Sequence, residues 1–191
     1  CALSLCADEL SFLCGGFPNE IEQICVATGN SIQRFEGHTD SVKSIALCVS
    51  TTEFLSGSDD STILLWSIDS GAQLRSFEGH TDSVYSLSVC ANGTHFISGS
   101  WDSTVLLFDL AESAAVSAFT EHTEAVYAVA VFSDSQRFLS GSADKTIRLW
   151  QSGAAQSEKV FVGHSDSVDS VALCLDESFF LSGSRDFPVR L

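Results

Sequence analysis

The 191-residue sequence contains no methionine and few basic residues. Nine Lys and Arg stand against 25 Asp and Glu, so the formal net charge is -16 and the pI is about 4.3. A protein that binds nucleic acid neutralises phosphates with Lys and Arg, so this composition argues against a nucleic-acid partner. Anionic membrane surfaces are disfavoured for the same reason. We expect partner proteins with basic contact surfaces.

Long apolar runs and helical patterns are also missing. No apolar segment approaches the roughly 20 residues of a membrane-spanning helix, so direct membrane insertion is not expected. No segment keeps a helical period over the roughly 11 residues that indicate a helix. Because no initiator residue is present and both ends fall inside a repeat unit, we expect the sequence to be part of a longer protein.

Motifs for catalysis and metal binding are absent as well. The sequence has no P-loop and no kinase motif and no Cys-x-x-Cys pair of the kind that holds structural zinc. We therefore expect no cofactor, no bound metal and no enzymatic activity from this chain.

What the sequence does contain is a 42-residue pattern that occurs four times in fixed register. Ser-Gly-Ser begins at Ser56, Ser98, Ser140 and Ser182; a histidine recurs at His38, His80, His122 and His164; an aspartate recurs at Asp60, Asp102, Asp144 and Asp186; and an aromatic residue recurs at Trp66, Phe108 and Trp150. A period near this length marks an array of identical supersecondary units, none of which can bury its faces alone.

The cysteines also follow the repeat. Cys6, Cys48, Cys90 and Cys174 are equivalent, and Phe132 takes their place in the remaining copy. A position that accepts Cys or Phe is a packing position, and equivalent positions lie a whole unit apart, which is usually too far for a disulfide. We expect reduced thiols and a reducing, cytoplasmic location.

One unit, residues 79–120, shows the local pattern. Short β-branched and apolar segments predict strands over 84–89, 94–100, 104–109 and 115–119, with a turn at Asn92-Gly93. Four short strands with turns between them indicate an antiparallel sheet. Each sheet is apolar on both faces and needs a neighbour on each side, which radial repetition provides.

One unit contains Gly37-His38, then the segment Ser56–Thr62 and then Ile63-Leu64-Leu65-Trp66. This order of motifs resembles the WD40 repeat, and the likeness extends over essentially the whole chain. The resemblance implies an all-β propeller with four-stranded antiparallel blades. About four and a half blades are expected, at residues 1–36, 37–78, 79–120, 121–162 and, incomplete, 163–191. Similar proteins most often close with seven blades, so we expect two or three more blades beyond the ends or from another chain.

The sequence departs from the family pattern in places. The Trp-Asp dipeptide is replaced by Trp66-Ser67, Phe108-Asp109 and Trp150-Gln151, and one Gly-His becomes Glu121-His122. In the first unit, Cys14-Gly15-Gly16-Phe17-Pro18 replaces the Ser-Gly-Ser motif and Ile24 replaces the aromatic residue. The geometry of that unit's outer edge is therefore left open.

Serine, histidine and aspartate together can form a catalytic nucleophile. The same set recurs in four units without a Gly-x-Ser-x-Gly turn, and an enzyme rarely needs four copies of one site. The resemblance implies instead a hydrogen-bonded network inside each blade, made of the loop His, strand Ser, turn Asp and strand Trp. Its expected members are His38, Ser56, Asp60, Trp66, His80, Ser98, Asp102, His122, Ser140, Asp144, Trp150, His164, Ser182 and Asp186. Because the third blade has Phe108, its network should be one bond shorter.

Function should lie where the repeats differ. Two variable positions, one before the turn aspartate and one after the first strand valine, lie on one rim of similar propellers. The predicted partner-binding residues there are Lys43, Asp59, Tyr85, Trp101, Tyr127, Asp169 and Arg185. Trp101 is the strongest candidate, because its equivalents are not large apolar residues. The alternative is that both tyrosines only pack between blades.

An acidic residue also follows each loop histidine at Asp40, Asp82, Glu124 and Asp166. These residues either line the same rim and attract a basic partner or mark a loop position that favours short acids.

The leading hypothesis is a non-catalytic scaffold that holds subunits in a multiprotein assembly. The alternative is the regulatory WD40 portion of a larger enzyme, such as a kinase or an NTPase, whose catalytic domain lies outside this chain. A third hypothesis is a purely architectural subunit of a large complex. The flanking sequence would separate the first two hypotheses.

Overall fold

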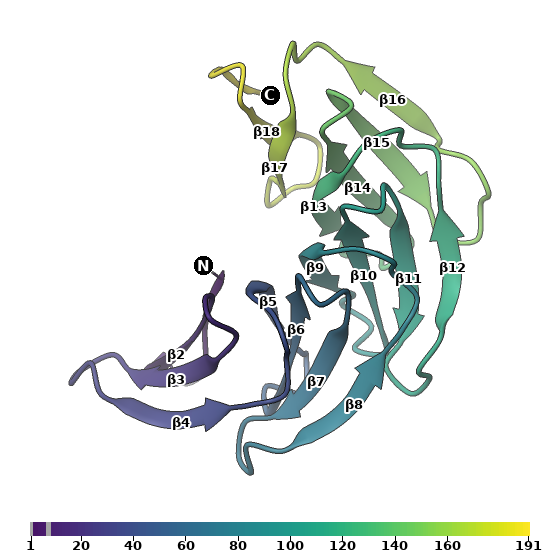
Figure 1. Cartoon of the computed structure of the whole chain (residues 1–191). Helices are drawn as coiled ribbons and strands as arrows, with labels where there is room; N and C mark the ends of the chain where they lie inside the picture. Colours follow the sequence, from purple (N-terminus) through teal and green to yellow (C-terminus); the bar gives the residue numbers. More distant parts are fainter. Residues whose placement is uncertain (1, 7–8) are drawn as a thin grey trace.

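The computed structural model describes residues 2–6 and 9–191 as an arc of five β-sheets around an open centre (Figure 1). Four sheets have four antiparallel strands and the last has three. Both termini lie on the open side of the arc (Figure 1). Within the two described ranges there is no helix, and so none long and apolar enough to cross a membrane. The predicted all-β fold of antiparallel blades is confirmed.

Each sheet, here called a blade, comes from one unit of the repeat. The first blade contains β1 (Ala2–Leu5), β2 (Ser11–Gly15), β3 (Ile21–Cys25) and β4 (Ser31–Phe35). The second contains β5 (Val42–Leu47), β6 (Glu53–Ser58), β7 (Ile63–Ser67) and β8 (Gln73–Phe77). The third contains β9 (Val84–Val89), β10 (His95–Ser100), β11 (Val105–Asp109) and β12 (Ala115–Phe119). The fourth contains β13 (Val126–Val131), β14 (Arg137–Ser142), β15 (Thr146–Gln151) and β16 (Lys159–Val162). The fifth contains β17 (Val168–Leu173), β18 (Phe180–Ser184) and β19 (Val189–Arg190).

Strands within a blade follow chain order from the centre of the arc to its periphery (Figure 1). The first strand of each blade contacts the first strand of the next blade. In the third blade, β9 and β12 have the predicted bounds, whereas β10 and β11 each begin one residue later than predicted. The innermost strands therefore carry the residues that face the open centre.

The apolar core lies between blades rather than within them. At the boundary of the second and third blades, Leu55, Ile63 and Phe77 pack against Val84 and Phe96, and all five side chains are buried. Equivalent clusters fill the other three boundaries. No blade can bury its own faces, so each depends on its neighbours for stability.

Aromatic rings organise these boundaries. Phe77, at the end of an outer strand, meets Phe96 of the next blade edge-on at a centroid distance of 4.9 Å. Phe96 in turn stacks on Phe108 at 5.0 Å, with an interplanar angle of 9°. The arrangement recurs in the trios Phe35–Phe54–Trp66 and Phe119–Phe138–Trp150. Such pairs contribute beyond simple area burial. The phenylalanine partners share the 42-residue spacing, but the sequence motifs did not predict their contacts.

The central glycine of Ser-Gly-Ser is required by the approach of the next blade. A Cβ atom on Gly99 would lie 2.7 Å from Val126 Cγ1 and 3.2 Å from Val129 Cγ1. The same contact recurs, at 2.7–2.8 Å, in the pairs Gly15–Val42, Gly57–Val84 and Gly141–Val168. The glycine therefore marks the point of closest approach between an inner valine and the preceding blade.

The first blade keeps the outer-edge geometry despite its divergent sequence. The pairing of β3 with β4 shifts register between Gln23 and Ile24. The second and third blades shift at the equivalent place, beside Trp66 and Phe108. This register shift at the outer edge therefore does not need an aromatic residue. The first unit, which has Ile24 there, pairs its outer strands as the second and third units do.

Glu121, which replaces the glycine of Gly-His, has a local partner. Its carboxylate accepts hydrogen bonds from the Arg148 guanidinium and from the Ser157 hydroxyl. The Ser157 hydrogen bonds and the charge of Arg148 lower the pKa of Glu121. An ion pair thus joins the fourth blade's loop to its own strand β15.

The repeated cysteine position is a packing position. Cys6, Cys48, Cys90 and Phe132 are buried there, and Cys174 is half-buried in the last blade. None of these four cysteines forms a disulfide. Burial raises the pKa of the Cys48 thiol to about 12 and that of Cys90 to about 11. Both therefore remain protonated and unreactive near neutral pH.

Candidate functional site

Four polar side chains form a continuous hydrogen-bonded chain inside the second blade. The Trp66 indole N–H donates to Ser56 Oγ at 2.8 Å, and the Ser56 hydroxyl donates to His38 Nε2 at 2.7 Å. The Asp60 carboxylate can only accept, so His38 Nδ1 carries the proton and donates to Asp60 Oδ2 at 2.9 Å. Every polar hydrogen of the chain thus has an acceptor, and the network is satisfied.

The fourth blade repeats all four members. Trp150 donates to Ser140 at 2.7 Å, and His122 lies 2.7 Å from both the Ser140 hydroxyl and Asp144 Oδ2. The same geometry in two blades follows from the common spacing of these residues in the sequence.

Two blades have shorter chains. In the third, His80 lies 2.7 Å from the Ser98 hydroxyl and 2.8 Å from Asp102, and Phe108 supplies no N–H. In the fifth, the corresponding bonds are His164–Ser182 at 2.8 Å and His164–Asp186 at 3.0 Å. The third blade therefore provides a natural comparison for the contribution of the indole.

The turn aspartate is the most heavily bonded member. Besides His38, the Asp60 carboxylate accepts hydrogen bonds from the Thr39 amide at 2.8 Å, the Thr62 amide at 2.9 Å and the Thr62 hydroxyl at 2.6 Å. Thr62 belongs to the repeated motif, although the sequence alone does not predict these bonds. Its equivalents Thr104 and Thr146 make the same bonds, whereas the fifth blade has Pro188 at this position.

These bonds determine the charge of the aspartates. Burial of Asp60 opposes its ionisation, but the hydrogen bonds from His38, Thr62 and Thr39 outweigh burial and hold its pKa well below the ordinary value of 3.8. The pKa values of Asp102, Asp144 and Asp186 are lowered by similar sets of bonds. All four are therefore carboxylates at neutral pH.

A pH prediction follows from these lowered pKa values. A carboxylate whose pKa is lower in the folded than in the unfolded state stabilises the fold above the unfolded pKa, and this contribution is lost as the pH falls. We expect the free energy of unfolding to be level above about pH 5 and to fall below about pH 4. In Asp60→Asn the protein should be less stable at pH 7, and its deficit relative to the parent should shrink below pH 4. Urea unfolding of both proteins from pH 7 to pH 3 measures this, and a deficit that stays constant over that range contradicts the assignment.

The serines of these networks are closed to solvent. Ser56, Ser98 and Ser140 are 0% exposed and Ser182 is 2% exposed. A nucleophilic hydroxyl must contact its substrate, whereas these hydroxyls are buried and hydrogen-bond to the histidine of their own blade. Ser182 differs only in that it lines, with His164, a pocket beside the last blade. The Ser-His-Asp sets therefore have the geometry of internal bracing.

The seven predicted rim residues form a single chain of contacts. On one side, Lys43 Nζ lies 2.8 Å from Asp59 Oδ2 and 6.0 Å from the centroid of the Tyr85 ring. Tyr85 meets Trp101 edge-on at 5.9 Å and Tyr127 edge-on at 5.2 Å. The second, third and fourth blades are thereby connected along the inner edge of the arc.

The chain of contacts continues into the fifth blade. The Arg185 guanidinium lies over the Tyr127 ring, with Cζ 5.4 Å from the centroid. Arg185 Nε donates to Asp169 Oδ2 at 3.0 Å. Both rim cations therefore contact an aromatic face and a carboxylate at once.

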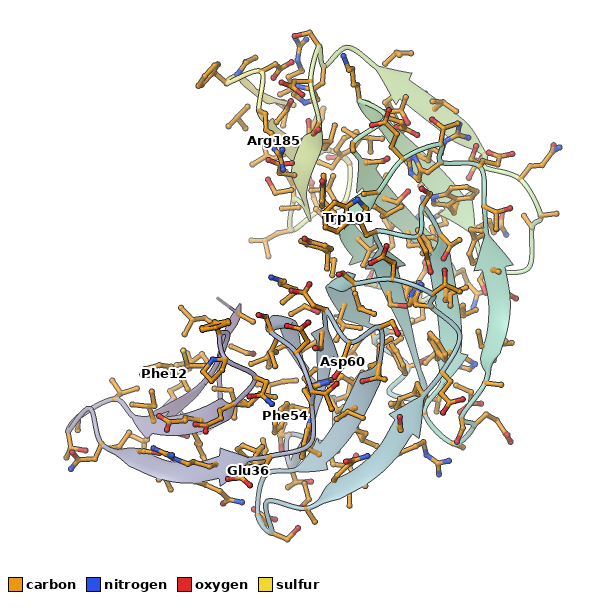
Figure 2. All side chains as sticks on the ribbon, viewed as in Figure 1. Phe12, Glu36, Phe54, Asp60, Trp101 and Arg185 are labelled. Atoms are coloured by element: carbon orange, nitrogen blue, oxygen red, sulfur yellow. The ribbon has the colours of Figure 1, made fainter. Side chains whose placement is uncertain are left out.

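This rim lies on the inner side of the arc, where Figure 2 shows Trp101 and Arg185. Trp101 stands in the turn between β10 and β11 and is 52% exposed. A shallow pocket, here called the rim pocket, is lined by Tyr85, Trp101, Tyr127, Asp169 and Arg185. Both tyrosines are half-buried, so they pack between blades and also present surface.

The acidic loop residues are exposed but bonded locally. The carboxylates of Asp40, Asp82 and Asp166 each accept a hydrogen bond at 2.7 Å from the next residue's amide. This geometry is what a loop position that favours short acids would give. It leaves their negative charge at the surface, so the two interpretations do not exclude each other.

Within residues 2–6 and 9–191, no three or more His, Cys, Asp or Glu side chains are grouped so that they could hold a metal ion.

The sequence matches the family model described as "WD domain, G-beta repeat" (WD40) over residues 29–67, 71–109, 114–151 and 155–187. No curated protein matches the chain.

Proposed function

Because the chain belongs to the WD40-repeat family, we propose that it is a non-catalytic platform that holds the subunits of a multiprotein assembly. Repeats of this family generally mediate protein–protein interaction. The observation that carries the proposal is the rim, where three aromatic side chains and two ion pairs form one partly exposed surface. Trp, Tyr and Arg are the residue types that dominate the energetics of protein interfaces.

The charge of the chain supports a basic partner surface. The net charge is -16, and the loop acids Asp40, Asp82, Glu124 and Asp166 are all exposed. Complementary charge speeds encounter and suppresses wrong partners. Binding should therefore weaken as the salt concentration rises.

We also propose that the protein works in the reducing environment of the cytoplasm. The support is the set of buried thiols at the repeated cysteine position, which pack as small apolar groups.

Trp101→Ala tests the rim as the binding surface. We expect affinity for the partners to fall roughly 10- to 30-fold, because truncation of an interface tryptophan costs about 2 kcal/mol. The fold should be unchanged, since the side chain is half exposed. The measurement is quantitative capture of binding partners by the parent and the variant, with melting temperatures to verify folding.

Val116→Ala is the matched control. Val116 is also large, apolar and 55% exposed, but it lies on the outer strand β12. If Trp101→Ala and Val116→Ala capture the same partners as the parent, the rim is not the binding surface. That result would favour a purely architectural subunit.

The regulatory portion of a larger kinase or NTPase remains the competing hypothesis. The sequence that flanks this chain tests it directly, because a catalytic domain would be recognised there by its own motifs.

A further inference from the structure

We infer that the rim pocket receives an arginine side chain from a basic segment of the partner, an inference that rests on the proposed function. The pocket combines an exposed indole, two tyrosines and the ion pair of Asp169 with Arg185 at the inner edge of an acidic molecule.

The sign of the charge favours a cation. The two rim cations are already neutralised, because Lys43 pairs with Asp59 at 2.8 Å and Arg185 pairs with Asp169 at 3.0 Å. The exposed loop acids, one in each of the second to fifth blades, then leave the surroundings of the rim negative. An incoming anion would be repelled and an incoming cation attracted.

The aromatic faces show where a cation fits. Tyr85 and Tyr127 each already contact a cation of this chain, Lys43 at 6.0 Å and Arg185 at 5.4 Å. In the part of the chain that the structure describes, none of the cation–ring contacts involves Trp101. Indole binds cations better than the other aromatic rings. The ring of Trp101, which is 52% exposed, is therefore available to a cation of the partner.

The shape of the site selects guanidinium over ammonium. Asp169 lines the same pocket as Trp101, and its Oδ2 accepts the hydrogen bond from Arg185 Nε. Its Oδ1 can accept a second donor. A planar guanidinium can stack on the indole while its N–H groups donate within the plane to that carboxylate. A lysine ammonium is a compact point charge and cannot stack in this way.

The test uses the whole chain and four blocked pentapeptides of sequence Gly-Gly-X-Gly-Gly, in which X is arginine, lysine, citrulline or glutamate. The readout is the indole N–H signal of Trp101 in ¹⁵N-resolved spectra, assigned by its loss in Trp101→Phe. The buried Trp66 and Trp150 serve as internal references. We expect the arginine peptide to shift only the Trp101 signal, with a Kd of about 1 mM, which is typical of a weak contact. Lysine should bind at least about fivefold more weakly, and citrulline and glutamate should give no shift.

Asp169→Asn should weaken binding of the arginine peptide about tenfold, as expected for loss of a charge-assisted hydrogen bond. Asp176→Asn, an aspartate in the turn between β17 and β18, should leave it unchanged. The inference is overturned if lysine or glutamate binds as well as arginine, if no peptide shifts Trp101, or if Asp169→Asn binds like the parent. If Trp101→Ala loses its protein partners while the arginine peptide gives no shift, the proposed function survives and only the arginine assignment fails.

Discussion

Gly99→Val should destabilise the protein by about 3 kcal/mol or more, among the largest effects expected of a single substitution here. The new Cβ alone would lie 2.7 Å from Val126 Cγ1 and 3.2 Å from Val129 Cγ1. Val126 is fully buried and β-branched, so it cannot rotate away as a flexible surface side chain would. The third and fourth blades would have to separate, and their shared core would lose contacts. Urea unfolding followed by circular dichroism measures the loss.

Two alanine substitutions separate the effect of the Cβ clash from other effects of replacing a glycine. Gly99→Ala adds only the clashing Cβ and should cost about 2 kcal/mol. Gly163→Ala is the matched control, because a Cβ there meets only Arg190 Nη1 at 3.5 Å and the backbone is outside the left-handed region. It should change stability by less than about 0.5 kcal/mol. Equal effects of the two alanine substitutions would show that close blade contact does not explain the glycine.

Ser56→Ala should cost about 3 kcal/mol, the second large effect. The substitution leaves two buried groups without their partner, the Trp66 indole N–H and His38 Nε2. Each unsatisfied buried polar group costs about 1–3 kcal/mol. Removal of the hydroxyl adds only a small cavity, so the lost bonds dominate the effect.

Ser98→Ala in the third blade is the control for Ser56→Ala, because that blade has no indole in its network. Ser98 is equally buried and bonds to His80 at 2.7 Å, but Phe108 has no N–H to lose. We therefore expect a cost about 1–2 kcal/mol smaller than that of Ser56→Ala. Chemical denaturation of both variants under one set of conditions measures the difference, and equal costs would contradict the role assigned to the indole.

The fold could be predicted from the sequence because each unit carries its own strand and turn signals. The segments that became β9 and β12 were predicted to the residue. The predicted strand over 94–100 begins one residue later, at His95, because Asn92 and Gly93 form a turn whose last bonds reach His95. Within a unit, local patterns decide the structure.

Contacts between units were harder to predict. The approach of Val126 to Gly99 joins residues of different blades, and so does the contact of Phe77 with Phe96. The pattern of one unit indicates that a residue is buried but does not show which neighbour it meets. The 42-residue spacing of these residues is visible in the sequence. The angle between neighbouring blades decides which residues meet, and the sequence does not show that angle.

In the candidate site too, features within one blade could be predicted and contacts between blades could not. The hydrogen-bonded sets inside the blades lie where the motif placed them, except that the contribution of Thr62 to the Asp60 carboxylate was missed. The rim residues were selected one by one for their variation. That Tyr85 contacts Tyr127, and that Arg185 covers Tyr127, depends on how far neighbouring inner strands lie apart. Their role in binding a partner remains a prediction.

One double-mutant cycle tests whether the buried polar chain braces each blade. Trp66→Phe gives the second blade the composition of the third, so Ser56→Ala in that background should cost only as much as Ser98→Ala does in the parent. The predicted coupling between Ser56 and Trp66 is then about 1–2 kcal/mol. Strictly additive effects, within about 0.5 kcal/mol, would mean that the 2.8 Å bond between indole and hydroxyl contributes nothing, and the bracing role would have to be abandoned.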